Sequence, residues 1–156
     1  MSSISRVLLP LLTLGSAAGL GTASGAPGQA DAQAAEMARL QGEWSMVSGA
    51  SDGQVIPDFM AHTGRRVAKG NETTATIGGV VVLKATFGVD PSKRPKTIDY
   101  VALEGPDQGR TLLGIYELAG DTLRTCFARA GQERPAEFAT QAGDQRTLTV
   151  WLRIRG

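Results

Sequence analysis

The residues best suited to chemistry are few in this sequence and far apart along the chain. His62 is the only histidine and Cys126 the only cysteine, so a zinc or copper site would lack the cluster of nitrogen and sulfur ligands that these metals need. A Ser-His-Asp triad would have to use His62, and no nucleophile-elbow pattern accompanies it. We therefore predict no metal site, no cofactor and no catalytic residue.

Two sets of charged residues suggest other functions. Asp99 and Glu117 lie on neighbouring predicted strands and could face each other, although charges paired across strands usually lie on a solvated face. A hydrolase would need two such carboxylates to converge in one cleft with perturbed pKa values. Lys93, Arg94 and Lys96 form a basic patch on a proline-rich loop, which is either a solvated turn or a contact for an acidic partner.

The N-terminus has the pattern of a secretory signal peptide. One positive charge precedes a mainly apolar run over residues 7–14, and small residues follow, with Ala23 and Ala26 as candidate cleavage positions. The apolar run is shorter than the roughly 20 residues that a membrane-spanning helix needs. We expect residues 1–23 to be removed on export to the periplasm or the extracellular space, and the mature chain to have no membrane span.

Net charge and cysteine content exclude some classes of binding partner and a disulfide within the chain. Loss of Arg6 with the signal peptide leaves 15 basic residues (16 minus 1) against 15 acidic ones, so bulk charge attracts neither nucleic acid nor an anionic membrane. An exported protein can form disulfides, but a single cysteine allows none within the chain. Cys126 is therefore predicted to be a buried, inert thiol, and the protein is expected to be a monomer.

The remaining chain is predicted to form one domain over residues 36–156 behind a flexible linker over 24–35. A short helix is expected from Asp31 to Leu40, with Asp31 as its N-cap. Strand-like runs separated by turn residues follow: 42–48, 65–69, 72–77, 80–87, 97–103, 111–118, 122–127, 136–140 and 147–154. The run over 80–87 is apolar on both faces, which favours cover on two sides.

Nearly every connection between these runs is of hairpin length. Strands linked so closely pair antiparallel, because a parallel crossover needs a dozen or more residues. We therefore predict an all-β fold, a small up-and-down antiparallel barrel of about 8–9 strands with a short N-terminal helix. Closure of the barrel would also remove exposed strand edges.

Gly42 and Trp44 begin the first predicted strand, and Arg153 and Arg155 lie at the end of the last one. This arrangement resembles the Gly-x-Trp signature of lipocalins, which implies that Trp44 closes one end of an eight-stranded barrel while Arg153 or Arg155 packs across its ring. Further motifs resemble an uncharacterised lipocalin-like domain family common in planctomycetes and related bacteria: residues 40–44, 90–99, 104–106, 111–118 and 120–123, Cys126, residues 133–135 and Phe138. The chain departs from this family at residues 64–68, where the family has a more apolar strand.

The resemblance implies a fold without an activity. With no catalytic set in view, the expected function is that of an exported, non-enzymatic, lipocalin-like barrel that binds a small apolar ligand. Four aromatic residues, Tyr100, Tyr116, Phe127 and Trp151, either line an internal pocket or simply fill the barrel. The alternative is a structural or inhibitor-like module that contacts a protein partner through the loops at 93–96 or 51–63.

Overall fold

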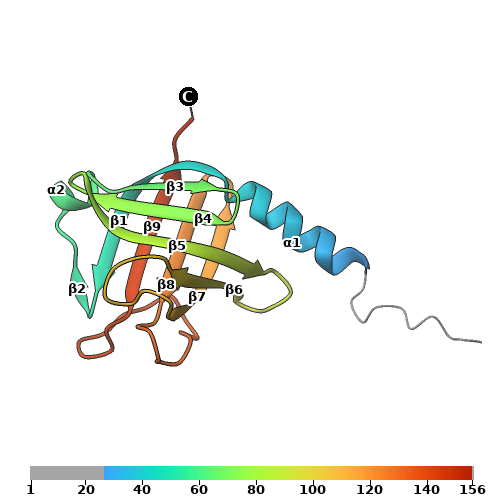
Figure 1. The fold of residues 1–156 in the computed structure, drawn as a ribbon. Coiled ribbons are helices and arrows are strands. Elements are labelled where there is room, and N and C mark those ends of the chain that lie inside the picture. Colours follow the sequence, from blue (N-terminus) through green and yellow to red (C-terminus); the bar gives the residue numbers. More distant parts are fainter. Residues whose placement is uncertain (1–26, 156) are drawn as a thin grey trace, which may run out of the picture.

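A computed structural model of the chain describes residues 27–155; the predicted signal peptide over residues 1–23 lies outside them. Two helices and nine strands make up the fold (Figure 1): α1 (Pro27–Arg39), β1 (Gly42–Ser51), β2 (Gln54–Val55), α2 (Asp58–Ala61), β3 (Arg65–Lys69), β4 (Glu72–Ile77), β5 (Val80–Asp90), β6 (Lys96–Ala102), β7 (Thr111–Ala119), β8 (Thr122–Phe127) and β9 (Thr147–Arg153). Neither helix is long or apolar enough to cross a membrane.

The strands form one antiparallel sheet that closes on itself. From β3 to β9 each strand pairs with its neighbours in the chain, and β1 pairs with both β3 and β9. Trp44 on β1 accordingly lies opposite Arg66 on one side and Arg153 on the other. The two-residue strand β2 pairs with β1 alone and stays outside the ring. The predicted barrel is confirmed, with eight strands in the closed ring.

Helix α1 begins earlier than the sequence pattern predicts. Residues 27–35 are helical rather than a flexible linker, and Asp31 lies inside the helix instead of capping it. Alanine and glutamine are good helix formers, and a proline at the first helical position, Pro27, sacrifices no intrahelical hydrogen bond. The C-terminal turn of α1 brings Glu36, and Leu40 just beyond it, against the barrel, where both are buried.

The run over residues 136–140, which the sequence suggested as a strand, is irregular. No strand position is open to it beside β8, because β8 already pairs with β7 on one edge and β9 on the other. Two outward-facing side chains on those strands, Ile115 and Cys126, are nonetheless buried, and the Cys126 thiol donates a 3.5 Å hydrogen bond to the Ala139 carbonyl. The segment from 128 to 146 therefore covers this part of the barrel's outer surface.

Burial confirms the prediction for Cys126 and contradicts the one for the start of β5. The Cys126 thiol is free and fully buried, and burial raises its pKa. Val80, Val81 and Val82, expected to be covered on both faces, are exposed. They lie before Ala85, where pairing with β6 begins, so this end of β5 pairs with β4 alone.

Candidate functional site

The barrel is closed at the end where α1 joins it. Trp44 is completely buried there, and its indole nitrogen donates a hydrogen bond to the Leu40 carbonyl at 3.2 Å. The Arg153 guanidinium lies 4.2 Å from the centre of the Trp44 ring and donates to the main-chain carbonyls of Arg39 and Gln41. Gly42 adopts a positive φ of 104°, a backbone conformation that glycine tolerates best. Arg155, the other arginine considered from the sequence, pairs with Asp121 instead.

A buried polar cluster joins α1 to the same end. The Tyr116 hydroxyl donates a 2.8 Å hydrogen bond to Glu36, which also accepts from Lys96 and Arg39. Burial alone would raise the pKa of Glu36, but the hydrogen bonds from Tyr116 and Lys96 hold it below its ordinary value. Burial and the bond to Glu36 raise the pKa of Tyr116. Each of these polar side chains has a hydrogen-bond partner, so the cluster fixes helix α1 to the barrel.

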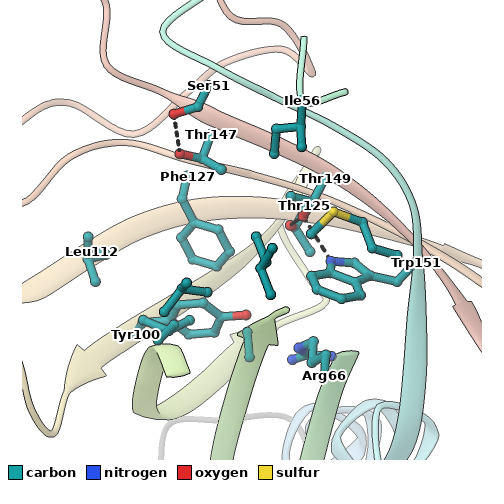
Figure 2. A pocket seen from close by; sticks show the side chains of 15 residues that line it. Ser51, Ile56, Arg66, Tyr100, Leu112, Thr125, Phe127, Thr147, Thr149 and Trp151 are labelled. Atoms are coloured by element: carbon teal, nitrogen blue, oxygen red, sulfur yellow. Dashed lines mark hydrogen bonds between the residues drawn. The ribbon is translucent and has the colours of Figure 1, made fainter. Parts of the chain in front are cut away.

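At the opposite end the barrel encloses a cavity of about 380 Å³. Figure 2 shows 15 side chains around it, contributed by strands on every side of the ring. Most are aliphatic or aromatic: Met46, Ile56, Ala75, Ile77, Val82, Leu83, Tyr100, Leu112, Phe127 and Trp151. This size falls within the range of roughly 300–1,000 Å³ that is typical of small-molecule sites.

Three of the four aromatic residues singled out in the sequence lie in this lining. The rings of Tyr100 and Phe127 stack with their centres 4.1 Å apart, and Trp151 stands across the cavity from them (Figure 2). Tyr116, the fourth residue considered for lining a pocket or filling the barrel, lies in the Glu36 cluster. Tyr116 pairs with Lys96, four residues along β6 from Tyr100, so its hydroxyl reaches Glu36 at the closed end.

The neutral polar side chains that β1, β8 and β9 contribute to the cavity wall bond to one another. The hydroxyls of Thr125 and Thr149 are 2.7 Å apart, and the Trp151 indole donates to Thr149 at 2.8 Å. Nearer the mouth, the Ser51 and Thr147 hydroxyls are 3.3 Å apart. These bonds satisfy the polar atoms of the wall locally, so this side of the cavity presents a mainly apolar surface to an occupant.

Arg66 is the exception. Its side chain is 1% exposed, it lines the cavity, and none of its three guanidinium nitrogens has a hydrogen-bond partner within residues 27–155. Its guanidinium lies 5.6 Å from the centre of the Phe87 ring, a contact that offsets part of the cost of burial. A buried cation without a counter-charge costs on the order of several kcal/mol.

The sequence pattern gave no reason to place Arg66 inside, because Val67 is the only large apolar residue of β3. In the structure Val67 is exposed, whereas Arg66 and Ala68 are buried. The orientation of Arg66 follows once its partner on β1 is known. The indole of Trp44 was assigned to the interior, and residues paired across antiparallel strands share a face. Arg66 is the partner of Trp44 on β3, so it must point inward too.

The catalytic alternatives do not come together. Asp99 lies opposite Leu113 rather than Glu117. Asp99 bonds Arg134 at 2.6 Å, whereas Glu117 bonds Arg124 at 2.7 Å. His62 is exposed, and no group of three or more His, Cys, Asp or Glu side chains in residues 27–155 is arranged to hold a metal ion.

The basic loop borders a second, more open hollow on the outer surface. It is lined by Asp90, Lys93, Arg94, Asp99 and Arg134 among others. Arg94 donates to carbonyls of its own loop, and Asp90 accepts from Ser92. Since charges of both signs line it and several are already paired, this hollow is a weaker candidate than the barrel cavity. Comparison with known proteins adds no assignment, since no family model, no curated protein and no solved structure matches the chain.

Proposed function

We propose that this protein is a non-enzymatic binding protein that takes a small, mainly apolar molecule into the open end of its barrel. The observation that carries the proposal is the cavity of about 380 Å³ lined by ten aliphatic or aromatic residues. Apolar surface removed from water contributes roughly 25 cal/mol per Å², so such a lining favours an apolar occupant. The closed end with Trp44 under Arg153 supports the lipocalin-like family prediction.

Titration with the neutral fluorescent dye 1-naphthylamine, which has about the dozen heavy atoms that the cavity volume allows, tests this function. The wild-type protein is expected to show saturable binding of one dye per chain. Ala75→Phe places a ring in the cavity and is expected to weaken binding at least about tenfold, because the ring takes the volume the dye needs. Thr74→Phe adds the same ring at the next residue, which faces away from the cavity, and serves as the matched control.

Absence of saturable binding by the wild-type protein would refute the proposal, as would equal binding by Ala75→Phe and wild type. Circular dichroism of both variants verifies that the barrel has folded, since adding volume to an interior can be destabilising.

One observation favours the alternative, an interaction module that works through its loops. The segment over residues 51–63 exposes three large apolar side chains, Val55, Phe59 and Met60, and Phe59 is 76% exposed. Large exposed apolar groups are frequent at protein interfaces. The dye titration separates the two functions, because the interaction module requires no saturable cavity binding.

The proposal includes export of the chain. It is supported by the signal-peptide pattern over residues 1–23. Expression of the full chain in a bacterial host should deliver a periplasmic product that begins after Ala23 or Ala26, as measured by intact mass. A product that retains Met1 to Ala23 in the cytoplasm would contradict export while leaving the binding function open to the dye test.

A further inference from the structure

Within residues 27–155, the buried side-chain atoms without a hydrogen-bond partner belong to Arg66 and to Thr73, and only Arg66 of the two lines the cavity. The hydroxyls of Thr125 and Thr149 and the indole of Trp151 bond to one another, and Tyr116 bonds to Glu36. Arg66, by contrast, has no hydrogen-bond partner for Nε, Nη1 or Nη2 within residues 27–155, and none of the ion pairs in that part of the chain includes it. Buried polar groups without partners are rare and call for an explanation.

The sheet holds Arg66 at the inner end of the cavity. Its neighbours across the strands are Trp44 of the closed end and Ala75 of the cavity wall. Figure 2 shows the guanidinium at the bottom of the cavity, with Trp151 above it and the Tyr100 hydroxyl directed into the same space. Ala75, which also lines the cavity, has a small side chain beside the guanidinium.

Charge selects the class of ligand. Arg66 is the one charged residue among the 15 that line the cavity, so an entering anion meets a single cation and no carboxylate. A guanidinium keeps its charge in proteins, and its planar fork matches the two oxygens of a carboxylate. A monoanion balances this single cation, whereas a dianionic phosphate would bring a second, uncompensated charge into a mainly apolar cavity.

Resting on the function proposed above, we infer that the ligand is an amphiphilic carboxylate whose head group binds Arg66 and whose apolar part extends toward the mouth. At about 30 Å³ for each water-sized group, a cavity of 380 Å³ holds roughly a dozen heavy atoms. A medium-chain fatty acid has this size and polarity. The apolar body then contacts the Tyr100 and Phe127 rings, while the carboxylate supplies the hydrogen-bond acceptors that the protein does not.

The test compares two ligands of equal size, decanoate and decanamide, by calorimetric titration at pH 7. Wild-type protein is expected to bind decanoate at least about tenfold more tightly, because a charge-assisted hydrogen bond distinguishes the two. Arg66→Met should bind both ligands with similar affinity. Arg65→Met removes the same charge from the adjacent residue, which is exposed and bonds the Ser45 hydroxyl, and it should keep the wild-type preference.

Two other outcomes for the wild-type protein would overturn this inference. If wild-type protein binds neither ligand, both the proposed function and this inference fail. If it binds both equally, the cavity function stands and the inference is overturned, whatever the fate of the variants. Should Arg66→Met fail to fold, Arg66→Lys keeps the charge without the fork and is expected to show a reduced preference for decanoate.

A stability measurement separates ligand binding from a purely structural role for Arg66. In the absence of added ligand, Arg66→Met should melt at a higher temperature than Arg65→Met, because an uncompensated buried charge is replaced by an apolar side chain of similar length. A lower melting temperature together with an unchanged decanoate preference would assign Arg66 to structure and overturn the inference.

Discussion

Arg153 and Trp44 hold the closed end of the barrel through one stacked contact and the hydrogen bonds around it. The Arg153 guanidinium covers the indole and donates to two carbonyls of the segment that leads from α1 into β1. The stacking contact and the charge-assisted hydrogen bonds both depend on the Arg153 guanidinium, so replacing this side chain removes both.

We predict that Arg153→Met lowers the free energy of unfolding by about 2 to 4 kcal/mol, measured by urea denaturation. Arg155→Met removes an exposed arginine that shares the partner Asp121 and should cause a much smaller loss. Equal losses in the two variants would show that the stacked contact contributes nothing beyond the surface ion pair.

Glu36 ties α1 to the barrel and should make stability depend on pH. Because its pKa is lowered in the folded state, it stabilises the fold above the ordinary carboxyl value near about 4.3, and this contribution is lost as the pH falls through the lower folded pKa.

In urea denaturation at several pH values, Glu36→Gln should therefore be least stable relative to wild type at pH 7, with the difference shrinking below about pH 4. Glu117→Gln controls for the loss of one negative charge, since Glu117 lies on the outer face beside Arg124. A wild-type advantage that grows in acid would contradict the assignment of Glu36 as an ionised, bonded group.

At the scale of elements, the long segment between β8 and β9 protects part of the barrel wall. Asp144 accepts hydrogen bonds from the Thr140 hydroxyl and from the main chain at Gln141 and Arg146, which fixes the turn after Ala139. Cys126 lies beneath this segment with a raised pKa, so it should react with a disulfide reagent only when the segment opens.

Asp144→Ala is expected to speed the labelling of Cys126 at least about fivefold under native conditions, because the turn loses three hydrogen bonds. Asp107→Ala, in the loop between β6 and β7, should leave the rate unchanged. Fast labelling of the wild-type protein would show that the segment does not cover the thiol.

Several elements were predictable because local rules and the whole fold agree. Turn residues and hairpin-length links gave the strands from β3 to β8, and the Gly42-x-Trp44 motif placed the start of β1. The rules failed where tertiary structure overrides them. On β3 the single large apolar residue, Val67, faces outward, and the run over 136–140 looked like a strand although β8 has no free edge for it.

At the scale of the whole molecule, the closed antiparallel barrel follows from the sequence but the cavity does not. Closure and antiparallel order could be argued from turn spacing alone. The interior volume depends on which residues of each strand face inward, and a shift of one residue reverses that choice. Arg66 belongs to the site because its side chain faces inward, and no motif in the sequence marks that orientation.

The two tryptophans of the chain allow one direct measurement of where a ligand binds. Trp151 lines the cavity, whereas Trp44 closes the other end. In a proton–nitrogen NMR titration with 1-naphthylamine, the indole signal of Trp151 should shift saturably while that of Trp44 stays in place. A shift confined to Trp44, or no shift of either signal, would contradict a ligand site at the open end of the barrel.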